Sequence, residues 1–301
     1  MIIAVASGAH ASDTAPLRLT CSHPFEASHP LAEDFLRPWA NGIAADSGGA
    51  LQVELVASAT SLSSCALAPV DTALGALLAL PFQMPDDARR ASEVAYASLH
   101  EEETRAGDPP TKVLLAAVML PLDMVGTGES RMPPLPGGLE GQRLEAPTDA
   151  VAELLKQIGA EVVAQTEAPV TAHLATLSMY PEAAWIMTFE AGRSLYSRPF
   201  ALRVSADQMA ALPAPFRALM TQVPGQALSA AAGRALNRAR AVGLEAAERR
   251  GVRVSLSEDR TGQALGRAAA LSETWRTQNA AHRAAYEVFL AGKAIASGPS
   301  R

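Results

Sequence analysis

The first part of the chain alternates strand-like and helix-like patterns. Residues 17–21 and 51–56 alternate apolar and polar side chains, as half-buried strands do. Between them, the apolar side chains from Leu31 to Trp39 recur at helical spacing, and the turn Ser47-Gly48-Gly49 follows. This order of strand, helix and strand within 40 residues predicts a βαβ unit.

The same patterns continue to the C-terminus. The helix over 226–250 would be about 37 Å long, enough to brace two lobes. Further strands are predicted over 65–70, 112–119, 142–146, 161–163, 182–188 and 252–254. The remaining helices are predicted over 85–104, 148–158, 169–178, 206–220 and 261–293. Residues 126–141 are rich in Gly and Pro and predict irregular structure.

Composition narrows the class of protein. The 301 residues are 49% hydrophobic and 19% charged, which indicates a folded protein long enough for two domains. The net charge of −6 and the absence of a basic stripe argue against a nucleic-acid partner. No segment approaches the roughly 18 uninterrupted apolar residues of a membrane span.

The N-terminus has features of an export signal. Residues 1–6 are apolar, and Ala9-His10-Ala11 has the small-x-small form that signal peptidase accepts. We therefore expect residues 1–15 to be the remnant of a signal peptide and the protein to be periplasmic. A frayed N-terminal tail is the alternative.

Two cysteines, Cys21 and Cys65, lie in strand-like segments. In an exported protein they would be able to pair, whereas in a reducing cytosol they would stay free. Two unpaired buried thiols therefore remain the alternative to a disulfide. Their number and spacing exclude a zinc cluster.

Catalytic motifs are absent from the sequence. It contains no Gly-x-Ser-x-Gly elbow, no Walker loop and no His-Glu-x-x-His pair. The six histidines are scattered without metal-ligand spacing, and the glycines between 126 and 141 do not open a helix directly after a strand. We expect a binding protein without a cofactor rather than an enzyme.

Several short motifs occur in a characteristic order. They are His29-Pro30, residues 47–53, Leu80-Pro81-Phe82, Leu139-Glu140-Gly141 with Pro147, Ala211-Leu212-Pro213, and Gly251-Val252. Each consists of common residues, so their order and spacing carry the signal. Together they resemble the DctP-like solute-binding proteins of tripartite ATP-independent periplasmic (TRAP) transporters, from Leu17 to about Ala294.

The resemblance implies an α/β, two-lobed periplasmic-binding-protein-like fold. Two mixed βα sheets would be joined by hinge strands and by the long helix over 226–250. We expect one lobe to comprise 16–119 and about 205–235. The other would comprise 120–204 and about 252–293. Such a protein captures a small molecule by a Venus-flytrap closure of its lobes and delivers it to integral-membrane TRAP permease subunits.

One candidate ligand residue departs from the family pattern. The family binds a ligand carboxylate with an arginine two residues before the proline, and here that position holds Glu145. Arg143 points to the same face of the predicted strand and would be able to take over the anion. If Glu145 lines the cleft, it would repel a carboxylate and favour a cation or a neutral donor, with Asp123 as a second acid. An exposed acid at Glu145 and a solvated Arg143 are the alternatives.

Other candidate ligand residues come from two further segments. Tyr180, Trp185 and Phe189 lie near the segment that lines the family's cleft, and their rings would suit a cationic or cyclic ligand. A core position is the alternative for Trp185. His23 and Glu26 lie in the first loop, which reaches the cleft in this family; a loop-capping role is the alternative for His23 and for the nearby histidine at position 29.

Two other classes of function remain open. A descendant that no longer serves transport would act as a ligand sensor or as an exported protein with an occluded cleft. An enzyme on the same scaffold is the third class, and it would need titrating groups in hydrogen-bond contact within the cleft.

Overall fold

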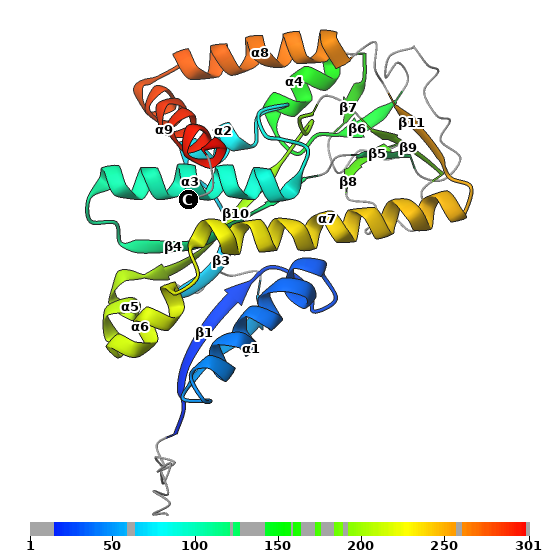
Figure 1. Cartoon of the computed structure of the whole chain (residues 1–301). Helices are drawn as coiled ribbons and strands as arrows, with labels where there is room; N and C mark the ends of the chain where they lie inside the picture. The colour runs from blue at the N-terminus through cyan, green and yellow to red at the C-terminus, as the bar shows by residue number, and fades with distance from the viewer. Residues whose placement is uncertain are drawn as a thin grey trace, which may run out of the picture.

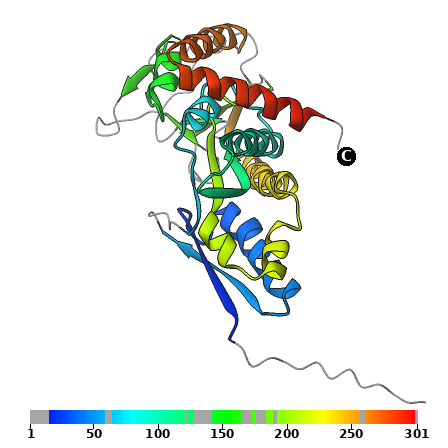
Figure 2. The ribbon, with the colours of Figure 1, turned by 90° about the vertical axis from the view of Figure 1, so that its left-hand side faces the viewer.

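The structure, a computed structural model, describes most of the chain and shows two β-sheets connected by helices. The described residues are 15–58, 64–120, 123–126, 142–157, 159–163, 172–175, 184–188, 192–256 and 261–298. Figure 2 shows the N-terminal strands and α1 at one end of the molecule and α4 and α8 at the other. The predicted α/β, two-lobed fold is confirmed.

The first sheet is mixed and has the strand order β2-β1-β3-β10-β4. Strand β1 is parallel to β2 and β3, whereas β10 is antiparallel to β3 and β4. These strands are β1 (Leu17–His23), β2 (Leu51–Ala57), β3 (Cys65–Pro69), β4 (Thr111–Met119) and β10 (Arg198–Ser205). The βαβ unit predicted for the start of the chain is therefore confirmed.

The second sheet has the order β11-β9-β5-β8-β6-β7. Its strands are β5 (Asp123–Gly126), β6 (Arg143–Glu145), β7 (Glu161–Val163), β8 (Ala172–Ala175), β9 (Trp185–Thr188) and β11 (Arg253–Leu256). The helix predicted over 169–178 is wrong, because residues 172–175 pair with β5 and β6 as a strand. Pairing partners from distant parts of the chain overrode the local pattern there.

The helices follow the predicted order with small differences. They are a π-helical turn η1 (Ala32–Leu36), α1 (Arg37–Asp46), α2 (Ala73–Leu78), α3 (Ala88–Ala106), α4 (Asp149–Gln157), α5 (Ala206–Ala211), α6 (Ala214–Thr221), α7 (Gly225–Arg249), α8 (Thr261–Thr277) and α9 (Ala280–Ser297). Asn279 divides the helical stretch predicted over 261–293, because its side chain accepts a hydrogen bond from the backbone N–H of His282 and caps α9. Among the described helices, none is both long and apolar enough to cross a membrane.

Both faces of the first sheet are buried. In β10, Phe200 and Leu202 face the core shared with η1, α1 and α7, whereas Ala201 faces the core shared with α2, α3 and α9. This alternation follows from the two-residue period of a strand. Cys21 and Cys65 lie on the first of these faces and form a disulfide, so the pairing that the sequence left open is present.

Two cores also flank the second sheet. Leu144 and Trp185 pack with α4 and α8 on one face. Val125 and Ile186 pack with Ala247 of α7 on the other. The Trp185 ring covers Gly126, where an added Cβ would lie 2.0 Å from the indole, so this position requires glycine.

The helix α7 spans both parts of the molecule. Its first half packs on α3 and β4 of the first sheet, and its second half packs on the second sheet through Ala247. Figure 1 shows it running from beside β3 and β10 to β9 and β11. The long spanning helix predicted over 226–250 is confirmed.

The chain passes between the sheets at neighbouring points. Met119 ends β4 and is paired with Arg198, which begins β10. Tyr196 belongs to the core of the second sheet and Phe200 to that of the first, so residues 196–200, of which Arg198 alone is exposed, link the two cores. Strand β10 therefore belongs to the first sheet, whereas the sequence analysis assigned residues up to 204 to the second lobe; the lobe boundaries stay a prediction.

Candidate functional site

The carboxyl end of β1 is the natural place to search for a ligand site. Strands β2 and β3 lie on opposite sides of β1, so the connections of this parallel part leave it in opposite directions. Ligands of open α/β sheets bind beside the carboxyl ends of strands at such a switch point. Here β1 ends at His23, and the Arg198–Met119 pair, where the chain crosses to the second sheet, lies at the same edge.

His23 and Phe25 form the first part of this site. The backbone N–H of Phe25 donates to His23 Nδ1 over 3.3 Å, and the backbone N–H of Ser58, just after β2, donates to the carbonyl of His23 over 2.9 Å. Both side chains are largely buried, with exposed fractions of 5% for His23 and 8% for Phe25. Burial lowers the pKa of His23 and favours its neutral form.

His29 extends the cluster toward solvent. Its ring stacks on Phe25 with a centroid separation of 4.2 Å, and its Nδ1 accepts the backbone N–H of Leu31 over 3.2 Å. Burial, and then the charge of His23, lower the pKa of His29. Since Nδ1 of each neutral imidazole is an acceptor, Nε2 carries the hydrogen. The hydrogen-bond donor of each ring is therefore its Nε2–H group.

Arg198 supplies the positive charge. Its guanidinium carbon lies 5.5 Å from the centroid of the Phe200 ring, and Phe200 packs on Phe25 with centroids 5.1 Å apart. The Arg198 side chain is exposed, and none of the described carboxylates forms an ion pair with it. Tyr196 lies close by: burial raises its pKa, and the charge of Arg198 opposes that shift.

The arrangement suits an organic anion. A guanidinium fork can hold a carboxylate by two charge-assisted hydrogen bonds, and neutral imidazole N–H groups can donate further ones. The rings of Phe25, His29 and Phe200 offer an aromatic surface beside these donors. In the described part of the chain no group of three or more His, Cys, Asp or Glu side chains is placed to hold a metal ion.

Arg143 and Glu145 are placed together on one face of β6. Leu144 between them is buried in the core with α4 and α8, so the two charged side chains point to the opposite face. The Nε of Arg143 donates to Glu161 Oε1 of the adjacent strand β7 over 3.3 Å. This cross-strand ion pair engages the arginine that the sequence offered as an alternative anion site.

The other predicted site residues have different outcomes. Trp185 is 2% exposed and packed in the core, which favours the core role over a ligand platform. Glu26 is exposed in the loop after β1, and its carbonyl accepts the backbone N–H of His29 over 3.0 Å. Asp123 begins β5, paired with Ala175 and Thr188. Tyr180 and Phe189 lie outside the described residues.

The sequence analysis did not select Phe25, Phe200 or Arg198. A signal for Arg198 was present, because it is the one charged residue in the apolar stretch from 195 to 202. A cation within an apolar strand is costly unless the strand end reaches solvent or a ligand. The proximity of Phe25 and Phe200 depends on strand pairing over long sequence distances and has no local signal.

Comparison with known proteins gives matches among solved structures alone. No protein-family model matches the chain, and no curated protein does. A TRAP periplasmic solute-binding protein from Bordetella bronchiseptica with bound mandelate is similar at a TM-score of 0.71 and 17% identity, over 93% of this chain and 99% of that one.

Two further structures agree. A TRAP solute-binding protein from Rhodoferax ferrireducens with copurified benzoate matches at a TM-score of 0.73 and 18% identity, over 93% of this chain and 98% of that one. An open complex of a TRAP periplasmic solute-binding protein from Desulfovibrio salexigens matches at a TM-score of 0.74 and 13% identity, over 95% of this chain and 98% of that one. Over nearly its whole length, the chain has the two-lobed fold of the TRAP periplasmic solute-binding proteins, as the resemblance in its sequence predicted.

Proposed function

We propose that the protein is an extracytoplasmic solute-binding protein that captures a small organic anion between its lobes and delivers it to a TRAP-type membrane permease. The observation that carries the proposal is the whole-chain match in fold, which includes both sheets and the spanning helix. Two lobes joined by crossing strands are able to close on a ligand by a hinge motion. Binding followed by release requires no catalytic group.

The chemistry of the neighbours supports an anion. Solved neighbours hold mandelate, benzoate, orotic acid, acetolactate and pyroglutamic acid, and each of these ligands carries an acidic group. In this chain the family's arginine position holds Glu145, and Arg143 is paired with Glu161. The exposed guanidinium of Arg198 is free of such a pairing among the described carboxylates, so we assign the anion to Arg198. His29 and the Phe25–Phe200 pair would contact its apolar part.

Export is part of the same proposal. The disulfide between Cys21 and Cys65 is typical of proteins that fold in an oxidising compartment such as the periplasm. The solved neighbours are periplasmic proteins. The apolar N-terminal residues followed by Ala9-His10-Ala11 supply the matching processing signal.

Thermal unfolding of the purified protein with benzoate, mandelate, orotate and pyroglutamate tests the proposal, with benzylamine as a cationic control. A ligand that binds the folded state alone raises the Tm by mass action. We expect a carboxylate to raise it and calorimetry to give a single site. Arg198→Gln should weaken binding about tenfold or more, because a hydrogen bond to a charged group contributes about 1.5–3 kcal/mol.

Arg143→Gln is the matched control and should bind the same carboxylate with little change. If Arg143→Gln loses binding and Arg198→Gln keeps it, the anion site lies on β6 and our assignment is wrong. Stabilisation by the amine alone, lost in Glu145→Gln, would instead show a cation site at the altered family position. No response to any solute would favour the alternative of an exported protein with an occluded cleft and no role in transport.

A further inference from the structure

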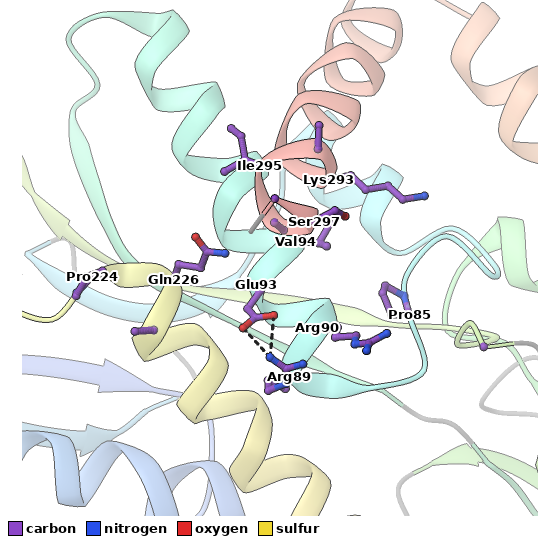
Figure 3. Close-up of a pocket in the computed structure, with 15 residues that line it drawn as sticks. Pro85, Arg89, Arg90, Glu93, Val94, Pro224, Gln226, Lys293, Ile295 and Ser297 are labelled. Atoms are coloured by element: carbon purple, nitrogen blue, oxygen red, sulfur yellow. Dashed lines mark hydrogen bonds and ion pairs between the residues drawn. The ribbon is translucent and has the colours of Figure 1, made fainter. Parts of the chain in front are cut away.

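A second hollow lies away from the candidate solute site, over the outer side of α3. It encloses 1260 Å³, and we call it the α3–α9 groove. Its floor is the first half of α3, and its walls are the start of α7 and the end of α9 (Figure 3). The lining residues are Pro85, Arg89, Arg90, Glu93, Val94, Gly192, Pro224, Gln226, Ala227 and 293–298. None of the candidate solute-site residues is among them.

The groove is positively charged within an acidic protein. It is lined by three cations and one carboxylate, which leaves two net positive charges, whereas the whole chain carries −6. Arg89 donates to Glu93 over 3.1 Å. Arg90 and Lys293 make no ion pair with any described residue, and Figure 3 shows both side chains extending toward the side of the groove where Pro85 lies. An anionic group is therefore attracted to this groove, although the net charge of the whole chain is negative.

Exposed apolar side chains accompany these charges. Ile295 lines the groove and is 54% exposed, and Val223, next to the lining residue Pro224, is 42% exposed. They are two of the six large hydrophobic side chains that are exposed in the described part of the chain. Unpaired cations beside exposed aliphatic side chains fit a surface that buries apolar groups and pairs charges on binding.

The size of the groove favours a polypeptide over a metabolite. Pockets for small molecules usually enclose about 300–1000 Å³ and are lined mainly by apolar groups with few polar contacts. This groove exceeds that range, lies between three helices, and carries its cations on two of them. An extended or helical segment with acidic and aliphatic side chains would satisfy both the charge and the apolar surface.

We propose that the α3–α9 groove docks an acidic segment of a partner protein, with carboxylates at Arg90 and Lys293 and aliphatic side chains at Val223 and Ile295. This surface is separate from the candidate solute site and does not depend on the proposed function. Electrostatic docking of this kind mainly raises the association rate and weakens as salt increases.

Fluorescence anisotropy of the full chain with a labelled peptide of alternating glutamate and leucine tests the proposal. Arg90→Glu and Lys293→Glu should each weaken binding about tenfold, because each replaces an attraction with a repulsion. Arg283→Glu makes the same change of charge at an exposed position of α9 outside the groove and should have little effect. Solute binding should be unchanged in all three variants.

Several results would overturn the proposal. If Arg283→Glu weakens peptide binding as much as Arg90→Glu and Lys293→Glu do, the attraction is not specific to the groove. If a peptide of alternating lysine and leucine binds as tightly as the glutamate–leucine peptide, leucine alone accounts for binding. Displacement of the peptide by citrate at a similar concentration would make the groove a small-anion site instead. Absence of peptide binding at low ionic strength would also contradict the docking proposal. If solute binding fails while the peptide result stands, the proposed function is wrong and the docking surface is kept.

Discussion

Cys21 of β1 and Cys65 of β3 are bonded across adjacent strands, with their Cα atoms 4.5 Å apart. The bond closes a segment with a sequence separation of 44 that contains α1 and β2. Both residues are buried, at 0% and 1% exposure, on the face of the sheet that holds Phe25 and Phe200. The disulfide therefore fixes β1 two residues before His23, at the base of the candidate solute site.

Removal of this disulfide should destabilise the protein. In a Cys21→Ala/Cys65→Ala variant the unfolded chain is no longer restricted by the bond and gains conformational entropy. For a loop of this length, the free energy of unfolding should therefore fall by about 2–4 kcal/mol. Urea unfolding followed by circular dichroism measures it. Addition of a reductant should lower the midpoint of the wild type and leave that of the variant unchanged. Equal midpoints for oxidised wild type and variant would show that the bond adds no stability.

Helices α3 and α7 approach closely at Gly233, and substitution there should be costly. A Cβ at Gly233 would lie 2.3 Å from the carbonyl oxygen of Ala88, so backbone would have to move. We expect Gly233→Ala to destabilise by about 1–3 kcal/mol, as overpacking does. Gly266→Ala in α8 is the control: nothing lies within 4 Å of its Cβ, and the helix should gain up to about 1 kcal/mol. A neutral Gly233→Ala would show that the two helices separate easily.

Local patterns in the sequence predicted much of the fold. The alternation over 51–56 and the uninterrupted helical pattern over 226–250 are strong, short-range signals, and both elements are present. The pattern over 169–178 misled, since the described residues there pair with β5 and β6, and such pairing overrides local preference. Ambiguity between strand and helix is expected for short apolar runs.

The candidate site was less predictable because tertiary contacts create it. His23 was selected from its place in the first loop, but its relation to Phe200 depends on strand order in the sheet. The aromatic ring of Trp185 made it a candidate ligand contact. In the structure the ring packs against Gly126 and lies in the core instead. Sequence indicates which residues are able to bind a ligand, whereas packing decides which of them solvent can reach.

The ion pair between Arg143 and Glu161 should contribute little to stability. The side chains are 28% and 61% exposed, and solvent screens such pairs to about 1 kcal/mol or less. Arg143→Ala and Glu161→Ala should each shift the urea midpoint only slightly. Arg203→Ala is the contrasting variant, because Arg203 lies partly buried beside Glu102 and Glu103 and its loss leaves their charges unbalanced. Equal effects at Arg143 and Arg203 would contradict this difference in burial.

His23, which is buried, and His29, which is half-buried, should make stability depend on pH. Burial lowers the pKa of His23 and of His29 from the ordinary 6.5, so the unfolded state binds protons that the folded state does not. Stability is therefore complete above pH 6.5 and falls as the pH drops from there toward the folded pKa values. Urea midpoints measured across this window should decline in the wild type.

His23→Asn/His29→Asn is the variant that isolates this effect. The asparagine side-chain oxygen can still accept the backbone N–H groups of Phe25 and Leu31, but it does not titrate. Burial raises the pKa of Glu102 and Glu103, so these carboxyls act in the opposite direction, and equally in both proteins. As the pH falls below 6.5, the urea midpoint of the wild type should therefore decline more than that of the variant. A difference independent of pH would mean that the imidazoles remain as easily protonated in the folded protein as in the unfolded chain, and that their Nε2–H groups are not held ready for a ligand.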